Sequence, residues 1–174
     1  MGIRTEVRKA TKSVKKALAP DEAMEEQDIL DTLKAEHDEV KELLSQLQDA
    51  EGAAERKSLV EQIKEALIPH TKAEEKVVYD AVIALKDKDA QADGHEGYLE
   101  HEWASKTLER LGKITPATSP EHKAAAKVLK ELVEHHIREE ENNVWSDVEE
   151  NFSDEERLEM NRDFEAAKKK VKVS

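Results

Sequence analysis

The sequence contains the same set of metal-ligand residue types twice, once in each half of the chain. Each half has one histidine, a second histidine 33 or 35 residues later, and a glutamate four residues after that second histidine. The two sets are His37, His70 and Glu74, and His101, His136 and Glu140. Four histidines and two carboxylates that recur in the same order predict a metal site built from two half-sites.

The residue types favour a site for two metal ions. Imidazole suits zinc, iron, copper or nickel, and a buried carboxylate can bridge two ions. Six protein ligands are too many for one tetrahedral zinc ion, so we expect two ions bridged by Glu74 and Glu140. A purely structural role is disfavoured, because unpaired charges buried in a helical core would destabilise a domain strongly.

The spacing of apolar residues predicts long amphipathic helices that direct these ligands inward. Apolar residues recur every three or four positions, and the predicted ligands fill the gaps in that series. His37, for example, fills the gap between Leu33 and Val40. In the second predicted helix the same spacing places Val77 and Ala81 inward, beyond the ligands. A histidine and a glutamate four residues apart share one face of a helix, so each pair faces the core.

The fold class that follows is all-α, an up-down-up-down four-helix bundle with an extra helix at each end of the chain. The predicted helices cover residues 3–18, 22–50, 53–86, 93–111, 120–150 and 154–170. We divide the chain into a basic amphipathic N-terminal helix, the bundle, and a C-terminal helix with a basic tail. These segments cover residues 1–20, 21–151 and 152–174.

Three capping signals mark predicted helix starts. Ser119 followed by Pro120 is a strong start, and Ser153 begins a capping box. Asp93 is expected to cap the third long helix in the same way. Pro69 lies inside the second long helix and is expected to kink it just before the ligand histidine.

The composition points to helices with heavily charged outer faces. Charged residues make up 40% of the chain and aromatic residues 3%, and cysteine is absent. The net charge is −13, of which residues 1–20 carry +5 and residues 168–174 carry +4, leaving −22 for residues 21–167. Such an acidic body argues against nucleic acid as a partner and is compatible with binding metal cations.

Localisation is predicted from three absent signals. The sequence shows no cysteine, no secretory signal and no apolar run of membrane-spanning length, so we expect a cytoplasmic protein. The basic stripe of residues 3–18 allows contact with an anionic membrane. Packing of this stripe against the acidic body is the favoured alternative.

The other histidines are expected to lie outside the metal site. We expect His122 at the surface, His135 exposed or beside the ligands, and His95 off the helix face of His101. Three glutamates next to the predicted ligands are expected to point outward: Glu75, Glu139 and Glu141. Of these, Glu139 remains a candidate for a hydrogen bond to a ligand.

The order of the ligands, His then His-x-x-x-Glu and the same again on four helices, resembles the hemerythrin family. The closest likeness is to bacterial hemerythrin-like HHE cation-binding domains, over about residues 28–150. This resemblance implies a non-haem di-iron centre, with two iron ions joined by an oxo or hydroxo bridge. It implies that an open iron position binds O2, peroxide, NO or azide. The four histidines would be iron ligands and the two glutamates bridging carboxylates: His37, His70, His101, His136, Glu74 and Glu140.

One position departs from the oxygen-carrying members of the family. Those proteins have an extra histidine one turn before the third-helix ligand, where this chain has Gly97. His95, Tyr98, water or a carboxylate would have to replace that ligand. Tyr79 and Tyr98 are also candidates for radical quenching, although packing is the expected role of both. The more open coordination favours redox chemistry over reversible O2 carriage.

We therefore expect a protein that binds O2, peroxide or NO in oxidative or nitrosative stress or in iron handling. If the protein is an enzyme, we expect it to turn over peroxide as a catalase does. The alternative prediction is a non-catalytic metal sensor or iron store. A ferritin-like site is disfavoured, because it requires a glutamate three residues before a histidine and no histidine here has one. Signatures of zinc proteases, phosphate-binding loops and serine hydrolases are also missing.

Overall fold

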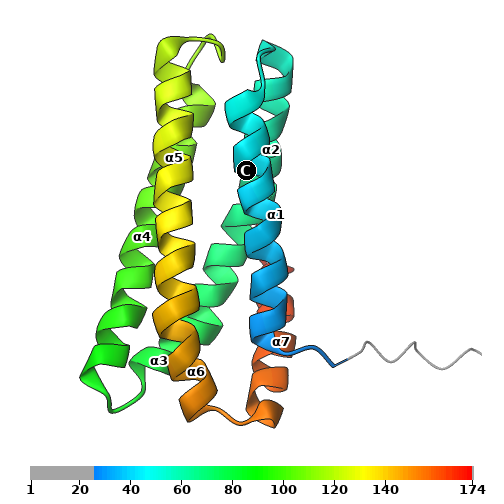
Figure 1. Cartoon of the computed structure of the whole chain (residues 1–174). Coiled ribbons are helices and arrows are strands. Elements are labelled where there is room, and N and C mark those ends of the chain that lie inside the picture. Colours follow the sequence, from blue (N-terminus) through cyan, green and yellow to red (C-terminus); the bar gives the residue numbers. More distant parts are fainter. Residues whose placement is uncertain (1–25, 174) are drawn as a thin grey trace, which may run out of the picture.

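The computed structural model describes residues 26–173. Its long helical segments, called arms below, run antiparallel, and a shorter helix packs beside them (Figure 1). The first arm is α1 (Ile29–Asp49), and the third is α4 (Lys88–Lys113). The second arm comprises α2 (Ala53–Glu74), the π-helical turn η1 (Glu75–Tyr79) and α3 (Asp80–Ile83). The fourth comprises α5 (Pro120–Glu139), the π-helical turn η2 (Glu140–Val144) and α6 (Trp145–Asn151). The last helix, α7 (Asp154–Lys168), packs against α1 and α2.

This architecture confirms the predicted all-α bundle with an additional C-terminal helix. No strand occurs between residues 26 and 173. Within that part of the chain, no helix is both long enough and apolar enough to cross a membrane. The predicted N-terminal helix, residues 3–18, lies outside the described residues.

Two helix starts follow the capping signals in the sequence. The Ser119 hydroxyl accepts a hydrogen bond from the backbone N–H of His122, and Pro120 is the first residue of α5. Ser153 forms a capping box with Glu156 at the start of α7. Both caps satisfy backbone N–H groups that the first helical turn leaves without partners.

The predicted start of the third helix at Asp93 is wrong. Helix α4 begins earlier, at Lys88, because the side chain of Asp87 caps the N-terminal turn. No strong helix breaker separates the two aspartates, so the helix starts at the first good cap. In the second arm Pro69 lies inside α2, which continues to Glu74 before the π-helical turn begins.

The two π-helical turns lie at the His-x-x-x-Glu motifs. The turn η1 follows Glu74 directly, and η2 begins at the corresponding glutamate of the fourth arm. A π-helical turn takes up one more residue than an α-helical turn, so the residues after it face a different direction. Val78 and Val82 are therefore buried in the second arm, one residue later than the predicted Val77 and Ala81, which are half-buried.

The apolar core has two parts, and the predicted ligands lie between them along each arm. On α1, Leu33 belongs to one apolar cluster and Val40 to the other, with His37 between them. On α2, Leu67 and Ala73 flank His70 in the same way. The predicted ligands thus form a polar layer in the middle of the bundle.

A second buried polar group lies at the end of the bundle where α1 meets α2. Arg56 is 1% exposed, and its guanidinium donates to the carbonyl oxygens of Leu47, Ala50 and Ala117, each at 2.8 Å. His122 Nδ1 lies 3.3 to 3.4 Å from the same guanidinium, and the residue is 2% exposed. The predicted surface position of His122 is therefore wrong, because Arg56 and the loop before α5 enclose it.

Candidate metal centre

All six predicted ligands are buried and come from four different arms. None of the six is more than 7% exposed: His37, His70, Glu74, His101, His136 and Glu140. The first and third arms each supply one histidine, and the second and fourth each supply a His-x-x-x-Glu pair. The antiparallel packing therefore brings residues from both halves of the sequence into one layer.

Glu74 lies at the junction of two ligand groups. Its carboxylate, His37 and His70 offer atoms within 4.8 Å of one another, and so do Glu74, His101 and His136. The Glu74 Oε2 atom is 3.3 Å from His70 Nε2 and 3.4 Å from His101 Nε2. One carboxylate therefore reaches a histidine of each half-site, as a bridging ligand would.

Glu140 has the equivalent position in the other half of the repeat. Its Oε2 atom is 3.3 Å from His136 Nε2 and 3.5 Å from His37 Nε2. Each predicted bridging glutamate thus faces the second histidine of its own half and the first histidine of the other half. Contacts of each glutamate with histidines from both halves are expected if the two glutamates bridge two metal ions.

The outer nitrogens of the second histidines face carboxylates of their own repeat. His70 Nδ1 is 2.8 Å from Glu36, and His136 Nδ1 is 2.7 Å from Glu100. Glu36 and Glu100 are the residues that precede the first histidine of each half. A carboxylate on Nδ1 orients the ring and leaves Nε2 directed at the centre, as is typical of metal-binding histidines.

The first histidines instead face carboxylates of the opposite repeat. His37 Nδ1 is 3.1 Å from Glu141, and His101 Nδ1 is 3.3 Å from Glu75. The expectation that Glu75 and Glu141 point outward is wrong, because Glu75 is 8% exposed and Glu141 is half-buried. Glu75 and Glu141 are the first and second residues, respectively, of the two π-helical turns η1 and η2. The feature of the sequence that could have indicated these contacts is the second glutamate directly after each predicted bridging glutamate.

The charges inside the layer shift the pKa values of its members. Burial is the largest single effect and lowers the pKa of His70, but the charges and hydrogen bonds of Glu74 and Glu36 together outweigh it and raise that pKa to about 10. Likewise, burial lowers the pKa of His136, and its interactions with Glu100, Glu140 and Glu74 together raise it to about 10. Burial and the charge of Glu74 raise the pKa of Glu140 to about 8. The cluster therefore binds positive charge, whether as protons or as metal ions.

Several buried polar atoms of the layer have no hydrogen-bond partner among residues 26–173. These atoms are His37 Nε2, Glu74 Oε1, His101 Nδ1 and both carboxylate oxygens of Glu140. Buried polar atoms are normally paired, because leaving them unpaired is costly. Imidazole nitrogens and carboxylate oxygens are the donor types that iron and similar ions bind, so the residues fit a metal centre.

Tyr79 occupies the space beside Gly97, where the oxygen carriers have their extra histidine. A Cβ atom at Gly97 would lie 2.6 Å from the Tyr79 ring. The Tyr79 hydroxyl is 3.4 Å from Glu74 Oε2 and 3.4 Å from the Nε2 atoms of His101 and His136. Glycine at this position therefore allows a tyrosine from the second arm to reach the centre.

The other candidates for that position point elsewhere. Tyr98 donates a hydrogen bond to the Asp80 carboxylate at 2.8 Å, on the outer side of the bundle. His95 is exposed to solvent. His135 is also exposed, and its Nε2 atom lies 3.4 Å from Glu100, beside the ligand layer.

Comparison with known proteins supports this description. The profile of the hemerythrin HHE cation binding domain matches residues 28–146, which include all six predicted ligands. A protein of Nostoc sp. (strain PCC 7120 / SAG 25.82 / UTEX 2576), named DNA nickase, is 29% identical over 147 residues. That match covers 84% of this chain but 41% of the relative, so the chain spans about two fifths of the relative's length. No solved structure matches the chain significantly.

Proposed function

The chain belongs to the hemerythrin HHE cation-binding family, and we propose that it is a non-haem di-iron protein that binds O2, peroxide or NO. Its role would lie in oxidative or nitrosative stress or in iron handling, with peroxide turnover as the enzymatic form. One observation carries this proposal: Glu74 and Glu140 each lie within 3.5 Å of histidines from both half-sites.

Each half-site offers ligands for one ion. His37 and His70 would hold one iron, His101 and His136 the other, and both glutamates would reach the two ions. When bound, the iron pair would supply electrons and an open coordination position for O2 or peroxide. The carboxylates on the Nδ1 atoms of the histidines would fix the rings and increase their basicity as ligands.

Tyr79 would act as a hydrogen-bond donor inside the centre. Burial and the charges of Glu140 and Glu74 raise the pKa of the Tyr79 hydroxyl well above its usual value, so the hydroxyl keeps its proton. Its oxygen lies at hydrogen-bonding distance from the inner nitrogens of His101 and His136. The hydroxyl donates to Glu74 Oε2 at 3.4 Å, and in the proposed centre it would donate to a small molecule bound beside His101 and His136.

Metal content and absorption spectra test this proposal. We expect about two iron ions per chain and a visible ferric spectrum that changes when azide or peroxide is added. His70→Ala should remove the colour, because it removes an inner ligand, whereas His95→Ala, at an exposed histidine, should keep it. A colourless protein with one zinc ion, or a fully coloured His70→Ala variant, would contradict the assignment.

A non-catalytic metal sensor or iron store is the second candidate. The enclosure of all six predicted ligands favours holding a metal over rapid exchange with solvent. Peroxide consumption separates the two candidates. Turnover well above that of the same concentration of free iron supports an enzyme, and iron binding without turnover supports a sensor or store.

We infer that nucleic acid is not the partner of this chain. The relative named DNA nickase is matched over only 41% of its length, so its activity does not transfer with the match. Residues 21–167 carry a net charge of −22, and such a body repels the phosphate backbone. A small neutral or diatomic ligand suits the enclosed centre better.

A further inference from the structure

A narrow hollow between α4 and the fourth arm extends from the surface to the predicted ligands. Its inner wall includes His136, Glu140 and Tyr79. Its volume of about 10 Å³ admits roughly one molecule of the size of water. The hollow therefore offers a path to the centre for single ions and very small molecules.

The outer wall of the hollow is acidic on both sides. Helix α4 contributes Asp93, Glu96 and Glu100, which recur at steps of three and four residues and so share one helix face. The fourth arm contributes Glu139 from the opposite side. Among residues 26–173, no lysine or arginine lines the hollow, so these carboxylates define the charge of its described walls.

The environment of Asp93 indicates that negative charge accumulates there. Burial raises the pKa of Asp93, and the charges of Asp89 and Glu139 raise it further. At the inner end, Glu140 is 2% exposed and neither of its oxygens accepts a hydrogen bond. A cation that passed the outer carboxylates would therefore meet a buried carboxyl group that accepts no hydrogen bond from residues 26–173.

We propose that this acidic hollow is a cation-selective entrance to the metal centre, which guides divalent metal ions inward and disfavours small anions. Small uncharged molecules such as O2 and hydrogen peroxide meet no such electrostatic barrier. Carboxylates in a narrow opening with low-dielectric walls focus their field and raise the local concentration of cations. The inference rests on the metal centre of the proposed function, but not on its redox activity.

The rate of metal uptake tests the entrance directly. Ferrous or cobaltous ion would be mixed with the metal-free protein under anaerobic conditions, and binding followed by absorbance in a stopped-flow instrument. The Glu96→Gln/Glu139→Gln variant should load about tenfold more slowly at low ionic strength and show a weaker dependence on salt. Its final metal content should equal that of the wild type, because both substituted residues lie outside the predicted ligand set.

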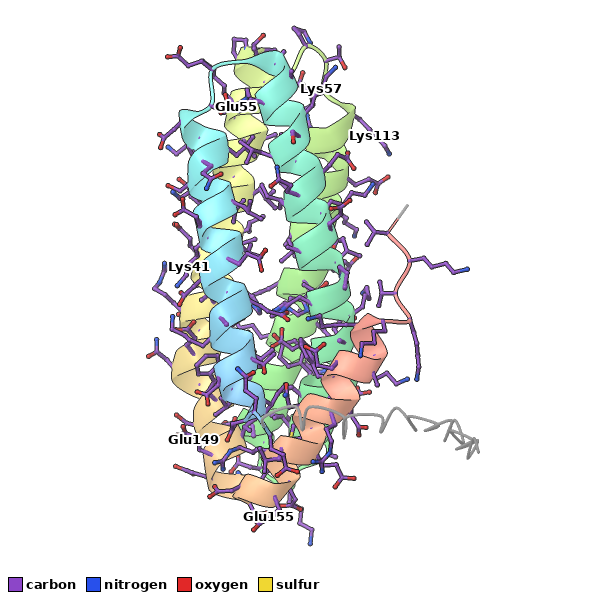
Figure 2. The ribbon with its side chains drawn as sticks, turned by 90° about the vertical axis from the view of Figure 1, so that its right-hand side faces the viewer. Lys41, Glu55, Lys57, Lys113, Glu149 and Glu155 are labelled. Carbon is purple, nitrogen blue, oxygen red and sulfur yellow. The ribbon has the colours of Figure 1, made fainter. Side chains whose placement is uncertain are left out.

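A matched variant separates the entrance from the overall charge of the protein. Glu51→Gln/Glu61→Gln changes the net charge equally at two exposed residues. Both are close in sequence to Glu55, which Figure 2 labels at the end of the bundle opposite Glu149 and Glu155. This control should load at the wild-type rate. Equal rates of metal loading for all three proteins, or equal slowing of both variants, would contradict the proposal that the hollow is the entrance for metal ions.

Anion binding provides a second measurement. Azide should bind to the ferric Glu96→Gln/Glu139→Gln variant several-fold faster than to the wild type at low ionic strength, because two negative charges are removed from its path. An unchanged association rate would contradict the selectivity. Metal loading at the expected rates without any reaction with O2 or peroxide would overturn the redox function and leave the entrance intact. A chain that binds neither metal would overturn both.

Discussion

Arg56 is a buried cation that pairs with no carboxylate in the part of the chain that the structure describes. The carbonyl oxygens of Leu47 and Ala50 at the end of α1 accept from its guanidinium, as does that of Ala117. The C-terminal end of a helix carries partial negative charge, which favours a cation there. His122 completes the group only if its Nδ1 is unprotonated, since a second positive charge would face the guanidinium.

This arrangement predicts a pH dependence of stability. Burial and the charge of Arg56 lower the pKa of His122, so the unfolded chain binds this proton more readily than the folded one. The contribution of His122 to stability is therefore complete above its unfolded pKa of about 6.5, and it is lost as the pH falls below that value. His122→Asn keeps an acceptor near the position of Nδ1 but cannot titrate.

We expect the melting temperature of His122→Asn to fall less between about pH 7 and pH 5 than that of the wild type. Thermal unfolding followed by circular dichroism would measure this difference. His95→Asn, at an exposed histidine, should behave like the wild type. Identical pH dependence in all three proteins would show that His122 does not set it.

Residue types and helical register were enough to predict which six side chains meet in the centre. The carboxylates of Glu75 and Glu141 were not predicted to face it, because an α-helical period assigns them to the outer face. Both residues lie at the start of π-helical turns, for which hydrophobic periodicity carries no signal. His122 was misplaced for a different reason, since its burial depends on Arg56, 66 residues away in the sequence.

At the scale of elements, α7 supports the centre although it lies beyond the residues matched by the family profile. Phe164 is fully buried, and its ring packs edge-on against His70 with the centroids 5.9 Å apart. Lys168 pairs with Glu36, the carboxylate that also contacts His70 Nδ1. In the other half, Glu100 faces His135 instead of a lysine, so the two half-sites differ in charge.

Lys168→Gln should therefore lower the reduction potential of the bound iron. Removing a positive charge near the centre favours the more highly charged ferric ion, by about 1 kcal/mol for a partly screened charge at this range. A potentiometric titration would measure the change. Lys169→Gln, an exposed neighbour with the same change in net charge, serves as the control. Equal shifts in both variants would exclude a specific role for the Lys168–Glu36 pair.

The number and order of the long helices could be predicted because each has a clear apolar stripe. Ser119 and Ser153 also located two starts correctly, since a capping serine has few competitors nearby. The prediction that Asp93 caps the third long helix was wrong because Asp87 offers an equivalent cap six residues earlier. Which of two possible caps begins a helix depends on how the added helical turn packs against the rest of the protein. The local sequence does not show that packing.

At the scale of the whole molecule, the ligand layer separates two apolar clusters of the core. Charged side chains cover the outside, as the labelled lysines and glutamates in Figure 2 illustrate. The division of the chain at residues 20 and 151 and its cytoplasmic location stay predictions. So does packing of the basic N-terminal residues against the acidic body.

Removal of metal should lower the stability of the entire bundle, because the polar layer joins all four arms. A ligand present at a hundred times its dissociation constant stabilises a protein by about 2.7 kcal/mol, which corresponds to roughly 5–10 °C in melting temperature at this size. Differential scanning calorimetry before and after dialysis against a chelator would measure the shift. His70→Ala should show a much smaller shift, and an unchanged wild-type melting temperature would contradict the coupling.

The contacts of Glu75 with His101 and of Glu141 with His37 cross between the two halves of the chain. Neither helical hairpin therefore contains a complete set of partners for its own histidines. During synthesis the last of these residues leaves the ribosome only after most of the protein has been made. A chain synthesised only as far as the first hairpin thus offers one half-site whose His37 still lacks its outer carboxylate, Glu141, and the full set of contacts forms only when both hairpins pack together.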